Sequence, residues 1–133
     1  AVDLAIASLR RAGVPQACVN AGGDLRFYGR EPRQIAIRDP LGPGRLRLLP
    51  PLSQGAVAST CVAATRRRHG RGWRSPLVDP RSGRVFAPAD SVTVIARSAL
   101  YADALTKPVA IDPPASEAAL RRLRARALVL PGA

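Results

Sequence analysis

Residues 91–107 read SVTVIARSALYADALTK, and this stretch says most about the fold class. Its first six residues are mainly β-branched, which predicts a strand over 91–96. Ser98 then offers an N-cap, and the residues after it suit a helix over about 99–107. Pro108 is expected to end or kink that helix. The stretch therefore predicts a strand that leads directly into a helix.

The sequence before this stretch predicts one helix and then several strands. Val2, Ile6 and Leu9 recur at helical spacing, which predicts a helix over 1–12. Short apolar runs follow, separated by turns rich in Gly, Pro and Asp, and such runs are typical of antiparallel strands. The predicted strands cover 17–20, 25–28, 34–38, 46–48 and 56–64, with 46–48 half-buried.

The end of the chain predicts another helix and a last strand. Ser116 is the expected cap of a helix that runs to about Ala127, and 128–130 returns as a strand. A helix, several strands and two helices in this order indicate an α+β fold with an antiparallel sheet, rather than alternating βαβ units. The chain has 133 residues, of which 47% are hydrophobic, so we expect one domain over 1–133.

The net charge of +12 raises the question of a polyanionic partner. The arginine-rich segment 66–74 would be the candidate nucleic-acid interface. However, almost all basic residues are Arg, with Lys107 the single lysine, and a GC-rich coding bias explains this pattern equally well. We therefore rank nucleic-acid binding last. No run approaches the roughly 18 apolar residues of a membrane span.

The cysteines do not indicate a metal site. Cys18 and Cys61 lie in apolar runs, far apart in the sequence, and no Cys/His cluster has the spacing of a zinc site. Two buried thiols are favoured over a disulfide.

Two turn segments carry groups that could bind a ligand. In the first, Gly22 and Gly23 allow the backbone to approach a ligand closely, and Asp24 could orient it, although a plain turn is the commoner explanation. In the second, Ser75–Gly83, Asp79 heads a turn and Arg81 could pair with it or with a phosphate. A purely structural turn explains this second segment equally well.

A third segment could hold a metal. Asp103 and Thr106 are three residues apart on the predicted helix and share a face. Carboxylate and hydroxyl oxygens are ligands that suit Mg²⁺. The plain alternative is a salt bridge between Asp103 and Lys107, which would contribute only a few tenths of a kcal/mol.

Taken in this order, the segments resemble the ApbE family of flavin transferases. Six family elements follow one another from Ala1 to about Ile111, which makes the resemblance specific. The matching residues are Ala1–Asp3, Val19–Asp24, Ala56–Cys61, Ser75–Gly83, Ser91–Val94 and Ala102–Leu105.

The resemblance implies both a fold and an activity. Family members have an α+β fold of the T-fold type, bind FAD and Mg²⁺, and transfer FMN from FAD to a Thr or Ser of an acceptor protein, releasing AMP. By this resemblance Asp103 is a metal ligand and Thr106 the nearby hydroxyl ligand. The loop with Ser59 and Thr60 would lie near the pyrophosphate. Gly22, Gly23 and Asp24 would line the flavin side.

The sequence also departs from the family pattern. Ser75 stands where the motif has a histidine that is a candidate for accepting the hydroxyl proton, and serine cannot do this unaided at neutral pH. The candidate catalytic residues are therefore Ser75 and Asp79. Cys61 replaces a loop glycine, and Lys107 occupies the position where a metal-binding threonine often lies. The alternative is a flavin- or nucleotide-binding module without catalysis, which could pair with a second copy through open sheet edges.

The family usually has a further N-terminal region. The chain begins at Ala1, directly in the first helix, and contains no methionine. We therefore interpret it as the C-terminal half of a longer transferase and expect the isolated chain to be inactive. The resemblance also implies a place at the cell envelope or in the periplasm.

Overall fold

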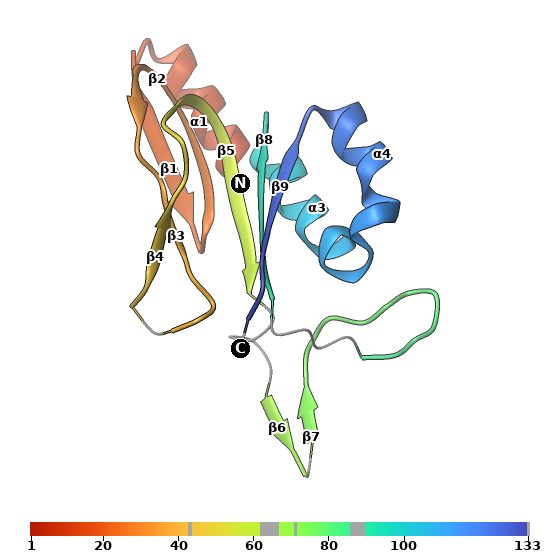
Figure 1. The fold of residues 1–133 in the computed structure, drawn as a ribbon. Helices are drawn as coiled ribbons and strands as arrows, with labels where there is room; N and C mark the ends of the chain where they lie inside the picture. The colour runs from red at the N-terminus through yellow and green to blue at the C-terminus, as the bar shows by residue number, and fades with distance from the viewer. Residues whose placement is uncertain (43, 62–66, 71, 86–89, 133) are drawn as a thin grey trace.

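The fold is built around a five-stranded antiparallel sheet in the order β1-β2-β5-β8-β9 (Figure 1). The computed structural model describes residues 1–42, 44–61, 67–70, 72–85 and 90–132. This architecture confirms the α+β prediction. The sheet strands are β1 (Ala17–Ala21), β2 (Asp24–Arg33), β5 (Leu52–Cys61), β8 (Ser91–Ala96) and β9 (Arg126–Leu130).

Smaller elements surround the sheet. Two hairpins pair separately from it, β3 (Ala36–Arg38) with β4 (Leu46–Leu48) and β6 (Arg67–His69) with β7 (Gly72–Arg74). The second hairpin falls in the segment predicted as an exposed basic loop or hairpin tip, of which Arg66 and Arg71 lie outside the described residues. The helices are α1 (Val2–Arg11), α3 (Ala99–Ile111) and α4 (Pro113–Leu123).

One face of the sheet packs against the helices. Alternate residues of β5 and β8 point to this side, and small side chains there allow α3 to approach the strands closely. Ala56, Val94 and Ala102 are 0% exposed. The rest of this cluster comes from α1, β5, β8 and α3: Val2, Ala58, Val92, Ala96, Ala99, Leu105 and Val109.

The β3–β4 hairpin contributes to a second core on the other face of the sheet. Phe27 and Val57 from the sheet pack with Ile37 from the hairpin. Leu46 and Leu48 in β4 are 64% and 63% exposed, so the prediction that this strand is half-buried is wrong. The buried residues of this region are Ile35, Ile37 and Leu49 instead.

Asp3 joins α1, β2 and the start of α3. Its carboxylate accepts hydrogen bonds of 3.0 Å from the N–H groups of Ala99 and Leu100, and it forms an ion pair with Arg26. Partial burial raises the pKa of the Asp3 carboxyl, but the bonds from Leu100, Ala99 and Arg26 outweigh this effect and lower the pKa. The first residues of the chain therefore hold a helix almost one hundred residues away.

Helix α3 begins as predicted but ends later. Ser98 is its N-cap and accepts a 3.3 Å hydrogen bond from the N–H of Tyr101. Pro108 was expected to end or kink the helix; it does not end it, because α3 continues to Ile111. Val109, only 2% exposed, packs in the core under the sheet. This burial outweighs the backbone hydrogen bond that proline cannot donate.

Helix α4 starts earlier than predicted. Its N-cap is Asp112, whose carboxylate accepts a 3.1 Å hydrogen bond from the N–H of Ala115. Ser116, the predicted cap, lies inside the helix and donates to the carbonyl of Asp112. The Asp-Pro-Pro sequence explains the difference, since proline fits the first helical position. The helix also ends before the predicted Ala127, because Arg124 adopts a left-handed conformation with φ of 51°.

The two cysteines are not joined to each other. Cys18 is exposed in β1, contrary to the prediction that it is buried, and Cys61 is half-buried at the end of β5. No described helix is long and apolar enough to cross a membrane.

Candidate functional site

The Gly22–Gly23 segment is a tight turn between β1 and β2. Both glycines have positive φ angles, 66° and 105°, which side-chain-bearing residues rarely adopt. The N–H of Gly23 donates a 3.1 Å hydrogen bond to the side chain of Asn20. The turn predicted from Asn-Ala-Gly-Gly-Asp is therefore confirmed. A binding role for the two glycines and Asp24 stays a prediction.

The sheet register brings this turn to the end of β5 that carries Ser59 and Thr60. Leu25 pairs with Val57, so Asp24 lies one step closer to that end. Because side chains alternate along a strand, Asp24 and Thr60 lie on the helix side of the sheet and Ser59 on the other. The Ser59 and Thr93 hydroxyls are 2.7 Å apart on that other side.

Ser59 and Thr60 lie in a strand, as the apolar run over 56–64 predicted, and not in the loop that the family resemblance implied. Both belong to β5 and pair with Thr93 and Val92 of β8. The run from Ala56 to Cys61 is rich in small and β-branched residues and pairs with β8 along its whole length, which favours a strand over an open loop. The two hydroxyls consequently point to opposite faces.

Thr60 and Thr106 connect β5 to α3. Their hydroxyl oxygens are 2.8 Å apart, and the Thr106 hydroxyl donates to the carbonyl of Asp103 at 2.8 Å. Thr106 is 0% exposed. The Thr60 hydroxyl therefore donates to Thr106, and the pair braces the helix against the strand. Thr106 stays a predicted metal ligand, although its hydroxyl is already bonded on both sides.

The Asp103 carboxylate faces a cation. Lys107, one helical turn later, forms an ion pair with its Oδ1. The two side chains are 47% and 45% exposed, so the pair stands at the surface. No group of three or more His, Cys, Asp or Glu residues is arranged to hold a metal within the described part of the chain. Asp103 is therefore a single exposed carboxylate with a lysine as its counter-ion.

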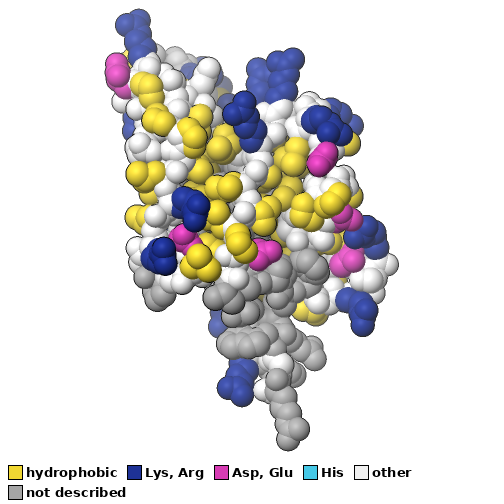
Figure 2. Space-filling view, in the orientation of Figure 1, with side chains coloured by type: hydrophobic (Ala, Val, Ile, Leu, Met, Phe, Trp, Pro, Cys, Tyr) yellow, Lys and Arg dark blue, Asp and Glu magenta, His cyan; other side chains and the backbone are white. Residues whose placement is uncertain are grey.

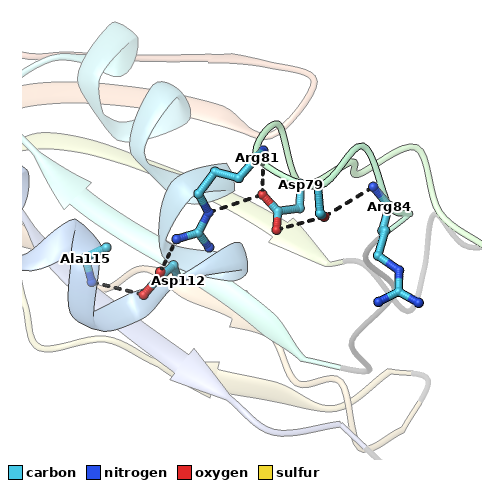
Figure 3. Close-up of polar contacts among 6 residues, drawn as sticks. Asp79, Arg81, Arg84, Asp112 and Ala115 are labelled. Atoms are coloured by element: carbon cyan, nitrogen blue, oxygen red, sulfur yellow. Dashed lines mark hydrogen bonds and ion pairs between the residues drawn. The ribbon is translucent and has the colours of Figure 1, made fainter.

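The Ser75–Gly83 segment is held by its own side chains and by α4 (Figure 3). Ser75 is 7% exposed, and its hydroxyl accepts a 3.1 Å hydrogen bond from the N–H of Leu77. Asp79 accepts from the N–H of Arg81 at 2.9 Å and from the hydroxyl of Ser82 at 3.1 Å. A bridge between Val78 and Val85 closes the turn.

Arg81 links this segment to the N-terminus of α4. Its guanidinium lies 2.9 Å from Asp112 and 3.4 Å from Asp79 (Figure 3). The N–H of Arg81 is the main cause of the lowered pKa of Asp79. The N–H of Ala115, followed by Arg81, lowers the pKa of Asp112. Both carboxylates consequently stay ionised and hold the loop on the helix.

This network predicts a loss of thermal stability in acid. Each folded-state pKa lies below its unfolded value, so the stabilisation is complete above about pH 4 and is lost as pH falls through the folded pKa. We expect the Tm of the Asp79→Asn/Asp112→Asn variant to lie below that of the wild type at neutral pH. In a series of thermal melts, the curves of Tm against pH for the two proteins should converge at about pH 2. Parallel curves over the whole range would contradict this assignment.

A cavity of about 670 Å³ separates the Ser75–Gly83 segment from α3 and α4. Asp79 and Lys107 lie at its border, and most of its lining is apolar, including Pro76, Pro80, Leu105, Pro108, Ile111 and Ala119. Its volume is within the range of about 300–1,000 Å³ typical of small-molecule sites. Of the predicted site residues, Asp79 lines this cavity. The other predicted site residues do not line it, namely Ser75, Asp103, Thr106, Gly22, Gly23, Asp24, Ser59 and Thr60.

Two contacts of the site were not predicted. Asp112 pairs with Arg81 across the cavity, and Thr60 pairs with Thr106. The Asp-Pro-Pro cap signal before α4 could have identified Asp112 as a structured residue. Nothing in the sequence connects Thr60 to Thr106, because that contact depends on how α3 packs on the sheet.

Comparison with known proteins gives one consistent result. A family model described as the ApbE family matches residues 1–129. A curated protein of Rhodobacter capsulatus, named FAD:protein FMN transferase, is 34% identical over 108 residues. That match covers 78% of this chain and 20% of the relative.

Two solved structures share the fold. The ApbE protein of Thermotoga maritima superposes with a TM-score of 0.73 at 25% identity, covering 96% of this chain and 45% of that one. The apo form of the flavinyl transferase ApbE of Pseudomonas stutzeri gives 0.74 at 28% identity, covering 96% and 41%. The chain thus spans less than half of these relatives. The comparisons do not bear out its assignment to their C-terminal half, which stays a prediction.

Proposed function

The chain belongs to the ApbE family, and we propose that it contributes the metal- and pyrophosphate-binding part of an FAD:protein FMN transferase. The relative from Rhodobacter capsulatus carries that name. The observation that supports the proposal most is the position of Asp103. Its half-exposed carboxylate forms an ion pair with Lys107, and Lys107 lines a ligand-sized cavity.

The proposed reaction breaks one phosphorus–oxygen bond and forms another. The hydroxyl oxygen of a Thr or Ser on the acceptor protein bonds to the phosphorus of the FMN part of FAD. The bond from that phosphorus to the AMP part breaks, AMP leaves, and the hydroxyl proton passes to a base. Mg²⁺, when bound, would offset the negative charge of the pyrophosphate.

Asp103 and Thr106 meet part of what a Mg²⁺ site requires. Asp103 supplies the hard oxygen ligand that Mg²⁺ prefers, and its ion pair with Lys107 marks a place where positive charge is favourable. In the proposal Thr106 is the second ligand, and its bond with Thr60 holds α3 at a fixed distance from β5. Gly22, Gly23, Asp24, Ser59 and Thr60 remain the proposed flavin- and pyrophosphate-binding residues.

A second candidate function is ligand binding without transfer. Ser75 is buried and its hydroxyl is bonded to the turn backbone, so it is poorly placed to take up a proton. Asp79 has a lowered pKa, which makes it a weak base. Both observations favour a flavin- or nucleotide-binding module. An acceptor protein and a location at the cell envelope belong to the transferase proposal, and pairing with a second copy belongs to the binding module.

Titration of FAD with and without Mg²⁺ tests the proposal. We expect calorimetry and flavin fluorescence to detect binding that requires Mg²⁺ in the wild type. Asp103→Asn should weaken it by at least about tenfold, since it removes the charge that holds the metal. Glu117→Gln is the matched control. Glu117 also forms an exposed ion pair with a basic residue four positions later, Arg121, but it lies on α4.

Three outcomes separate the candidates. Mg²⁺-dependent binding that only Asp103→Asn weakens supports the transferase proposal, and AMP release on adding a threonine-bearing acceptor would extend it to catalysis. FAD binding that does not require Mg²⁺ and is unchanged in Asp103→Asn supports the binding module instead. Equal weakening by Asp103→Asn and Glu117→Gln would contradict the assigned metal site.

A further inference from the structure

A second cavity, of about 570 Å³, lies at the opposite end of the sheet from Thr60. It opens where β8 ends and β9 begins, beside Gly55 of β5. Figure 2 shows Lys and Arg side chains gathered at the upper end of the molecule, near an apolar area. The basic residues that line this cavity are Arg10, Arg26, Arg97, Arg124 and Arg126.

Most of these arginines have no carboxylate partner. Arg26 is paired with Asp3. The other four make no ion pair with any residue that the structure describes. Several uncompensated positive charges around one cavity repel one another, and an anion in the cavity would relieve that repulsion. Other exposed arginines, such as Arg47 and Arg121, do have acidic partners.

Local contacts fix the position of Arg10. Its guanidinium lies 4.5 Å from the centre of the Tyr28 ring. The Tyr28 hydroxyl in turn donates a 2.6 Å hydrogen bond to the carbonyl of Val14. A guanidinium stacked on an aromatic ring keeps its N–H donors free for a ligand. The contact with Tyr28 therefore holds Arg10 at the rim of the cavity before a ligand binds.

Arg124 is an unusual residue at its position. It ends α4 with a φ of 51°, and it is the one non-glycine residue with positive φ in the described part of the chain. Glycine is the usual residue there, because a side chain makes this left-handed conformation less favourable. The left-handed conformation of Arg124 turns the chain from α4 into β9, where Arg126 lines the same cavity. An arginine that reduces stability at this place suggests a ligand that requires its charge.

One part of the cavity wall is apolar. Phe27, Leu52 and Ile95 form part of the lining, and Gly55 leaves one side without a side chain. Guanidinium groups bind phosphate oxygens in a fork geometry, and the apolar wall would contact a carbon skeleton. We propose that this cavity binds a small organic phosphate, with the phosphate at the arginine rim. The site is separate from Asp103 and needs no metal.

Calorimetry with phenyl phosphate and inorganic pyrophosphate tests this site. The titrations contain a chelator, so that a metal site at Asp103 takes no part. We expect one saturable site per chain, and Arg97→Gln/Arg126→Gln should weaken binding by about tenfold or more. The control is Arg30→Gln/Arg122→Gln, which removes the same charge from exposed arginines that do not line the cavity.

A third variant separates binding from folding. Arg124→Gly should keep or raise the Tm, because it relieves the left-handed strain, and yet weaken phosphate binding. Absence of saturable binding, or equal weakening by the two double variants, would overturn the proposal. So would preferential binding of a single-stranded oligonucleotide that both double variants weaken equally. FAD also carries a pyrophosphate, so the Asp103 titration is run in the Arg97→Gln/Arg126→Gln background, where binding at the arginine cavity does not contribute. The two proposals then fail independently.

Discussion

Replacing Asp3 with alanine should lower the free energy of unfolding by about 2–4 kcal/mol. The change leaves the N–H groups of Ala99 and Leu100 without their acceptor at the start of α3. It also leaves Arg26 without its ion-pair partner in a half-buried setting. Asp3 connects α1, β2 and α3, so its loss should loosen three elements together. Urea unfolding followed by circular dichroism measures the difference.

Two further variants make this prediction specific. Asp3→Asn keeps an oxygen acceptor without the charge, so it should fall between the wild type and Asp3→Ala. Glu117→Ala removes a carboxylate from an exposed pair with Arg121 and should cost less than about 0.5 kcal/mol. If Asp3→Ala cost no more than Glu117→Ala, the role assigned to Asp3 would be wrong.

Replacing Lys107 with threonine should strengthen Mg²⁺-dependent FAD binding by about tenfold, on the proposed function. The Lys107 ammonium contacts Asp103 Oδ1 and competes with a divalent cation for the carboxylate. Threonine removes that charge and adds a hydroxyl one turn from Asp103. The calorimetric titration used for the wild type measures the gain.

The control for Lys107→Thr uses a similar pair elsewhere. Arg121→Thr removes a positive charge from an i,i+4 pair on α4, and it should leave Mg²⁺-dependent binding unchanged. Weaker binding after Lys107→Thr would mean that the lysine contacts the ligand itself. In that case Lys107 would act as a phosphate-binding residue, and the assignment of the metal to Asp103 would need replacing.

Local sequence signals predicted the elements well where local energetics dominate. The β-branched run over 91–96 and the cap at Ser98 predicted β8 and the start of α3, and the paired glycines predicted the β1–β2 turn. The errors arose where packing outweighs propensity. Pro108 was expected to end α3, but burial of Val109 carries the helix further.

The residues of the site could be predicted from the sequence, but their arrangement in space could not. Asp79 and Asp103 were recognised from their motifs, and the structure places them near one cavity, Asp79 on its lining and Asp103 through its pair with Lys107. The motifs could not show that Ser59 and Thr60 face opposite sides of a strand, because this depends on pairing with β8. They also gave no sign of the second cavity, whose arginines come from α1, β2 and the segments around β8 and β9.

The position of a bound metal would test the proposed function most directly. Crystals of the chain soaked with FAD and Mn²⁺, a close substitute for Mg²⁺, would reveal the ion by its anomalous scattering. We predict one peak within coordination distance of the Asp103 carboxylate, with Lys107 moved away from it. A peak at another place, or FAD bound with no metal near Asp103, would contradict the proposal.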